Sequence, residues 1–401
     1  MQFQQVIGQE AVKQQLVEMV EGNRLSHALL FLAREGSGGL PLAQAFTQYL
    51  VCEKVQRAMK GGDTGASLFG EAAGPVVFPT DACGECPACQ KSSQMMHPDV
   101  HYSFPTIGKK DGASKTVSND WIVEFREFVK LMPYGNAFDW LQFINAENKQ
   151  GNITAEECND IIRKLSVKSF ESDYKVLVMW MPEYLGKEGN KLLKLIEEPP
   201  ANTLFILVAE NEEEILATIL SRTQLVRIPL LEVKEVAEGL EKRANLEPEQ
   251  ARRIAQLSEG NYREAIHMLS HASEDWLSIF REWMNAIMKN GPIAQVKWVE
   301  EVAKLGREKQ KQFLLYCNHT LEQAIRGQLI EGALEILPEG EKDFVTRFNK
   351  FLSIPQQQAI VEELDKASYY IERNANPKML FHALTIRLNH IITDKSLILV
   401  H

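Results

Sequence analysis

Short apolar runs alternate with helical patterns through the first half of the chain, and this alternation constrains the fold more than any other feature. The runs of strand length are residues 27–32, 141–146, 174–181 and 203–209. The segments with helical spacing are residues 41–52, 154–166 and 187–197. Thr154 and Glu157 have the spacing of a capping box at the start of the second helix. Because strands that alternate with helices form parallel sheets, residues 1–229 are predicted to be an α/β core.

The second half of the chain has a different pattern. After residue 230 no run is typical of a strand, and helical patterns cover residues 233–245, 247–257, 262–270, 276–289, 295–330, 355–373 and 377–392. A chain of 401 residues is too long for one core, so two or three domains are expected. We therefore expect a helical lid at 230–274 and a helical bundle at 275–401. Within the α/β core, the stretches 53–82 and 104–120 are predicted to be loops.

Charge and composition narrow the classes of function. The net charge is −10, whereas a protein that binds duplex DNA strongly by itself is usually basic. No basic stretch followed by an apolar run opens the sequence, so no signal peptide is expected, and no apolar run is long enough to span a membrane. We therefore expect a cytoplasmic protein whose six cysteines are not paired in disulfides.

The loop after the first predicted strand has the placement of a phosphate-binding loop but lacks its chemistry. Such a loop, GxxxxGK[ST], connects a strand to a helix, and residues 33–41 here read AREGSGGLP. Gly36 and Gly38 allow a tight backbone, although Ala33 replaces the first glycine of the motif. Gly39 stands where a lysine would neutralise the phosphates, and Leu40 stands where a hydroxyl would bind Mg²⁺.

The strand predicted at 174–181 is defective in the same way. Its end should carry acidic residues if it held Mg²⁺ and an activated water, but Trp180 and Met181 stand there. One interpretation is that 33–41 is only a glycine-rich turn. Because two separate halves of a nucleotide site are defective together, we favour a degenerate site that binds no ATP.

Four of the six cysteines lie in one region and indicate a metal site. Cys83, Cys86 and Cys89 are each separated by two residues, which allows successive sulfurs to point at one ion. Cys52 is the natural fourth ligand, although 30 residues separate it from Cys83, and His97 is the alternative. Zn²⁺ in a closed structural site fits these residues best, whereas free buried cysteines and an iron–sulfur cluster are the other interpretations.

Several blocks of the sequence taken together resemble a known family, the AAA+ clamp-loader subunits of bacterial DNA polymerase III. The resemblance covers residues 3–270 and is weaker in the last third. The blocks that carry it are FQQVIGQE (3–10), RLSHALLF (24–31), the loop at 33–41, CGECPAC (83–89), HPDV (97–100), GNKLLKLIEEPPANTLFILVAEN (189–211), SRT (221–223) and RNANPKMLF (373–381).

The resemblance implies an AAA+ core with a Cys₄ zinc module, a lid and a C-terminal helical collar that mediates oligomerisation. Within the family, the defective ATP site resembles that of the delta-prime type of subunit rather than that of the hydrolysing gamma/tau type. It implies a subunit that is no enzyme on its own and joins gamma/tau and delta subunits in a five-membered ring. In the family, that ring loads the sliding β-clamp onto primed DNA.

The resemblance also assigns roles to two arginines. Arg222, flanked by Ser221 and Thr223, matches the family's motif for an arginine finger, which stabilises phosphate charge in a neighbouring subunit. Without the family context, Arg222 would be interpreted as an ordinary surface or salt-bridged arginine. Arg263 matches the family's sensor-2 arginine and, with no nucleotide to contact, is expected to link lid and core. The alternatives are an active gamma/tau-type ATPase, or a zinc-containing adaptor or DNA-binding protein outside replication.

Overall fold

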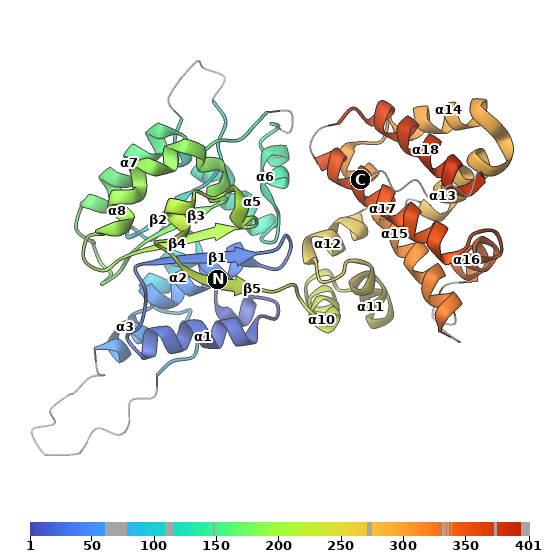
Figure 1. Cartoon of the computed structure of the whole chain (residues 1–401). Helices are drawn as coiled ribbons and strands as arrows, with labels where there is room; N and C mark the ends of the chain where they lie inside the picture. Colours follow the sequence, from blue (N-terminus) through green and yellow to red (C-terminus); the bar gives the residue numbers. More distant parts are fainter. Residues whose placement is uncertain are drawn as a thin grey trace, which may run out of the picture. The chain divides into compact units, whose positions relative to one another are not determined.

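The structure is a computed structural model that describes residues 1–60, 78–108, 116–146, 149–270, 275–330, 334, 337, 339–372 and 375–393. The predicted loops at 53–82 and 104–120 therefore lie partly outside the described residues. The first of these predictions is wrong at its start, because Glu53–Met59 form a helix. The chain divides into two units, Met1–His267 and Met268–His401. The first contains the sheet and helices through most of α12, and the second is helical (Figure 1).

Five parallel strands form the centre of the first unit (Figure 1). They are β1 (Ala28–Ala33), β2 (Val100–Ser103), β3 (Lys175–Trp180), β4 (Thr203–Ala209) and β5 (Gln224–Ile228). The order across the sheet is β2-β3-β4-β1-β5, so β1 pairs with β4 on one side and β5 on the other. The side chains of β3 and β4 are buried throughout, as expected for a parallel sheet covered on both faces. The parallel sheet, with the glycine-rich loop after β1, confirms the α/β core predicted from the sequence.

Alternate side chains of β1 enter separate hydrophobic cores on the two faces of the sheet. Leu29 and Phe31 join a core that includes residues of α1, α2, α5 and α6, whereas Leu30 joins a core that includes residues of α7 and α8. Figure 1 shows α2 and α7 on opposite sides of the sheet. The helices of this unit are α1 (Glu10–Glu21), α2 (Gly39–Val51), α3 (Glu53–Met59), α4 (Pro87–Ser93), α5 (Ile122–Leu131), α6 (Ala137–Phe143), α7 (Ala155–Ser166), α8 (Leu193–Glu197), α9 (Ala217–Leu220), α10 (Val233–Ala244), α11 (Pro248–Leu257) and α12 (Tyr262–Ser270).

The strand predicted at 141–146 is wrong, because the first half of that run belongs to helix α6 and the second half is a turn. Asn136 caps the helix: its side chain accepts a hydrogen bond from the Asp139 N–H, and the Asp139 carboxylate accepts one from the Asn136 N–H, both 3.0 Å long. The apolar residues then pack as a helical face, with Trp140 fully buried. The predicted helix at 187–197 is also different, since a 3₁₀ segment (Pro182–Leu192) precedes the short α8.

Strands β2 and β5 were not predicted from the sequence. β2 has only four residues, and β5 is an edge strand whose polar Gln224 and Arg227 are exposed. At α7, Thr154 accepts a hydrogen bond from the Glu157 N–H at 3.2 Å, but the Glu157 carboxylate accepts the Ser118 N–H at 2.7 Å. The cap therefore uses only half of the predicted pairing.

The second unit is a helical bundle around a core rich in aromatic residues. The Trp283 and Trp298 rings stack with centroids 4.5 Å apart, and Phe313 packs against both. The predicted helix at 295–330 is divided in two near Gly306, and α16 was not predicted. In the part of the chain that the structure describes, no strand follows residue 230. The helices are α13 (Trp276–Asn285), a π-helical turn (Ala286–Asn290), α14 (Gly291–Val302), α15 (Arg307–Leu329), α16 (Glu339–Phe351), α17 (Ile354–Glu372) and α18 (Pro377–Thr393).

Candidate functional site

The glycine-rich loop lies between β1 and α2, where the sequence placed it. Gly36 and Gly38 have φ angles of 70° and 94°, a left-handed conformation that glycine adopts without steric cost. Gly38 is the N-cap of α2. The backbone thus makes the tight turn that a phosphate-binding loop needs.

The lysine position of the motif has no room for a side chain. A Cβ atom on Gly39 would lie 2.5 Å from the Cβ of Ala33 and 3.1 Å from a methyl carbon of Val208. Leu40 is buried. The cavity that remains beside the loop has a volume of about 20 Å³, enough for about one water molecule. Ligand sites of small molecules measure roughly 300–1,000 Å³.

The end of β3 is apolar and closely packed. Trp180 is buried, with its ring 5.6 Å from the Phe125 ring and 5.9 Å from the Phe128 ring. Met181 is also buried and provides no carboxylate. The nearest acid along the chain, Glu183, accepts hydrogen bonds from the backbone N–H groups of Glu210 and Asn211, at 2.6 and 2.9 Å. Burial raises the pKa of the Glu183 carboxyl.

A buried ion-pair cluster lies next to the loop. Arg263 of α12 donates to both carboxylate oxygens of Asp139, at 2.5 and 2.6 Å, and to the Glu35 carboxylate at 3.1 Å. Burial raises the pKa of the Asp139 carboxyl, but hydrogen bonds and charge from Arg263 more than offset this, and the net pKa lies well below its ordinary value. The interpretation of Arg263 as a link between lid and core agrees with these contacts. The role of Glu35 was not predicted from the sequence, although an acidic residue is unusual in a loop with the placement of a phosphate-binding loop.

Arg222 lies at the surface, just after the short helix α9. Its Nε donates to Glu197 at 2.5 Å, and its Nη1 donates to the Thr218 carbonyl at 2.7 Å and the Ser221 hydroxyl at 3.0 Å. Thr223 donates its hydroxyl proton to the Leu220 carbonyl instead. About a third of the Arg222 side chain is exposed (33%). The guanidinium is therefore oriented by its own chain and still reachable from outside.

The four cysteines of the predicted metal site come together, although Cys52 is far from the other three in sequence. Cys52 lies between α2 and α3, Cys86 caps α4, and all four Sγ atoms lie within 4.8 Å of one another. Backbone N–H groups of Cys83, Cys86 and Cys89 donate to the sulfurs of Cys52, Cys83 and Cys86, respectively, at 3.3–3.4 Å. Hydrogen bonds from Cys89 and from the Cys83 N–H hold the pKa of the Cys52 thiol well below its ordinary value.

This donor set fits a tetrahedral ion. Four sulfurs around Zn²⁺ at about 2.3 Å would be roughly 3.8 Å apart, so a small contraction would suffice. His97 is not in the group: its Nδ1 accepts the Asp99 N–H at 3.2 Å, and its Nε2 lies 3.5 Å from the Glu171 carboxylate. Of the two candidates for the fourth ligand, the structure therefore places Cys52 beside the other three.

In the described residues, no helix combines the length and the apolar character that crossing a membrane requires.

A protein-family model described as "DNA polymerase III, delta subunit" matches residues 8–232. The chain is 23% identical over 261 residues to DNA polymerase III subunit delta' of Bacillus subtilis (strain 168), covering 65% of this chain and 59% of that protein. It is 25% identical over 310 residues to DNA polymerase III subunit tau of the same organism, covering 75% of this chain and 43% of that protein. It is 26% identical over 215 residues to DNA polymerase III subunit delta' of Escherichia coli (strain K12), covering 53% of this chain and 45% of that protein. The chain thus spans about half the length of these curated relatives.

Among solved structures, a gamma subunit-related protein from Thermotoga maritima aligns with a TM-score of 0.37 and 13% identity, covering 94% of this chain and 98% of that one. The Bacillus subtilis clamp loader delta protein aligns with a TM-score of 0.29 and 10% identity, covering 94% and 99%. Neither alignment is close enough to bear on function.

Proposed function

Because this chain belongs to the clamp-loader family described as DNA polymerase III, delta subunit, we propose that it is a non-hydrolysing subunit of a bacterial clamp loader. Such a ring would place the sliding β-clamp on primed DNA, with this chain beside gamma/tau and delta subunits in the cytoplasm. The curated relatives that match are delta' and tau subunits of DNA polymerase III. The observation that carries the non-hydrolysing role is the packed position of Gly39.

Three features of the first unit support the loss of ATP hydrolysis. The lysine position accepts no side chain, since Ala33 and Val208 occupy the space around Gly39. The hydroxyl position is the buried Leu40, which cannot bind Mg²⁺. The end of β3 carries Trp180, which cannot activate water. A chain of this kind contributes to the ring through assembly and through neighbouring sites.

Arg222 is the group that we assign to a neighbouring ATPase site. An arginine finger must reach phosphate charge across an interface, and Arg222 is oriented by Glu197 and Thr218 while remaining partly exposed. Glu197 neutralises the guanidinium in the isolated chain. On assembly the phosphate of the neighbour would compete with this carboxylate for the same donors.

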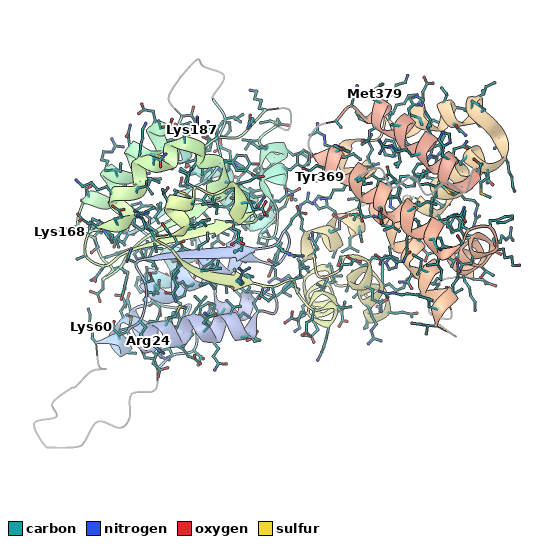
Figure 2. All side chains as sticks on the ribbon, in the orientation of Figure 1. Arg24, Lys60, Lys168, Lys187, Tyr369 and Met379 are labelled. Atoms are coloured by element: carbon teal, nitrogen blue, oxygen red, sulfur yellow. The ribbon has the colours of Figure 1, made fainter. Side chains whose placement is uncertain are left out.

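The helical second unit is assigned to oligomerisation. Large apolar side chains are exposed on α17 and α18, including Tyr369 (50%) and Met379 (71%), which Figure 2 labels. Exposed apolar groups of this size are typical of surfaces that bind another protein. In this proposal, residues 1–229 are the AAA+ core, 230–274 the lid and 275–401 the collar.

Zn²⁺ is the ion that we assign to Cys52, Cys83, Cys86 and Cys89. Four thiolates form a closed tetrahedral set, which is typical of structural zinc. When bound, the ion would supply a cross-link between the end of α2 and the segment that leads into α4. All four positions would be filled by protein, so a catalytic role is not part of the proposal.

The test is reconstitution with gamma/tau and delta subunits from the same organism. We expect Arg222→Ala to assemble normally and to lower clamp-stimulated ATP hydrolysis severalfold, because a finger contributes about 10³-fold or more at the one site it serves. Arg227→Ala, which removes an exposed arginine of β5, is the matched control and should hydrolyse ATP normally. Hydrolysis unchanged by Arg222→Ala would remove the finger from the proposal. Failure of the wild-type chain to assemble, or ATP hydrolysis by the purified chain alone, would overturn the proposed function.

A further inference from the structure

The chain places one of its own carboxylates at the loop where a nucleotide phosphate would bind. We propose that Glu35, together with Tyr134, acts as a built-in ligand that closes the lid helices α10–α12 on the core without any nucleotide. The inference concerns only the first unit and does not depend on ring assembly. It predicts that the conformation of the lid is insensitive to ATP.

The donors around Glu35 form an anion-binding arrangement drawn from both lid and core. Its Oε1 accepts hydrogen bonds from Arg263 at 3.1 Å and from Asn261 at 3.3 Å, both of which belong to the lid. Its Oε2 accepts a hydrogen bond from the Asn136 side chain at 3.0 Å, just before core helix α6. A guanidinium and amide N–H groups are the donors that proteins use for phosphates and carboxylates. The Glu35 carboxylate therefore connects lid to core as a bound anion would.

The charge balance around Arg263 disfavours an additional anion. Its guanidinium lies 3.1 Å from Glu35, 2.5 Å from Asp139 and 3.9 Å from Glu264. His267 also faces the Asp139 carboxylate, at 3.3 Å. The carboxylates of Glu35, Asp139 and Glu264 thus all lie within 4 Å of the Arg263 guanidinium. A phosphate entering this region would have to compete with these carboxylates for the Arg263 donors.

The lid is seated directly on the loop, with no space between them for a phosphate. A Cβ atom on Gly36 would lie 1.9 Å from the Asn261 amide oxygen. The Tyr262 N–H donates to the Gly36 carbonyl at 3.2 Å. The Gln9 side chain donates to the Ser37 carbonyl at 3.1 Å and to the Pro229 carbonyl at 2.7 Å. The loop therefore makes its contacts with protein groups on the side that faces the lid.

Tyr134 fills the adjoining space between the loop, the N-terminal segment and the lid. Its ring lies against Gly38, where a Cβ atom would approach to 2.8 Å, and its hydroxyl accepts the Ile7 N–H at 2.8 Å. The Tyr262 ring is 4.8 Å away, and the Arg243 guanidinium lies over both rings at 5.4 and 5.9 Å. Tyr262 and Arg243 of the lid thus pack on Tyr134, and apolar burial and cation–π attraction stabilise this contact.

Hydrogen exchange of the full-length protein tests the inference, because it reports the lid and the second unit separately. In the wild type, we expect α10–α12 to be protected without nucleotide, and Mg-ATP or inorganic pyrophosphate to leave this protection unchanged. Glu35→Ala removes a charge-assisted contact and should speed exchange in α10–α12 about tenfold or more. Helices α13–α18 should be unaffected. Glu213→Ala, which removes an exposed carboxylate from the 3₁₀ helix Glu212–Glu214, is the control and should match the wild type.

A second variant acts through sterics instead of charge. Gly36→Ala would push against Asn261 and should loosen the same three helices selectively. Lid exchange in Glu35→Ala equal to that of the wild type would overturn the inference. Slower hydrogen exchange in α10–α12 of the wild type on adding Mg-ATP would also overturn it. This measurement uses only the wild-type protein, so it does not depend on whether a variant folds. Reconstitution failures in the ring would bear on the proposed function alone.

Discussion

Replacing Asp139 with asparagine tests the buried ion pair that joins α6 to α12. The Asp139 and Arg263 side chains are 1% and 2% exposed, so loss of the carboxylate leaves a guanidinium buried with less compensating charge. Removing one partner of a buried pair typically costs about 3–5 kcal/mol. Glu35 still faces Arg263 at 3.1 Å, and asparagine retains one acceptor oxygen. We therefore expect Asp139→Asn to lower the free energy of unfolding of the first unit by about 3 kcal/mol, the lower end of that range.

Hydrogen exchange measured at increasing urea concentrations gives this free energy of unfolding for each unit separately. Asp343→Asn is the control, because it removes the carboxylate from an exposed Asp–Arg pair in the second unit and should cost under about 1 kcal/mol. Adding Arg263→Gln to Asp139→Asn should cost less than the sum of the two single changes, since the unpaired charge is gone. A cost below about 1 kcal/mol for Asp139→Asn, or strict additivity, would refute the buried-pair argument.

The same pair predicts a dependence on pH. The folded-state pKa of the Asp139 carboxyl is depressed, so its contribution to stability is complete above the unfolded-state pKa of about 3.9 and is lost as pH falls toward the folded-state value. The difference in unfolding free energy between wild type and Asp139→Asn should therefore shrink as the pH falls below about 4. A difference that stays constant down to pH 2 would contradict this assignment.

Two further predictions concern the loop and the cysteines. Gly39→Lys should lower the free energy of unfolding by about 1–3 kcal/mol, because the new Cβ atom collides with Ala33 and Val208. Titration calorimetry should detect no ATP binding by this variant. Tight Mg-ATP binding would show that only the lysine was missing. Metal analysis of the wild type should find about one zinc per chain, lost in Cys86→Ser but kept in the buried-thiol control Cys158→Ser; a folded wild-type protein free of metal would rule out the zinc assignment.

Local patterns predicted those elements whose residues are both long enough and apolar enough to be recognised alone. β1, β3 and β4 are central strands buried on both faces, so each appears as an uninterrupted apolar run. β5 is an edge strand with three exposed residues, and its pattern is too weak to identify. The run at 141–146 was assigned to the wrong element because Asn136 and Asp139, which cap the helix, lie outside the run itself.

The glycine-rich loop and the missing lysine, hydroxyl and acids were determined by the sequence alone, because each is a matter of residue type at a fixed spacing. Which groups occupy that region was decided by the tertiary structure. Glu35 and Arg263 are 228 positions apart, and 30 residues separate Cys52 from Cys83. A sequence pattern does not reveal such contacts, because these segments come together only when the chain is folded. The sequence therefore determined which residue types stand in the loop, and the packing of α6 and α12 decided which groups lie against it.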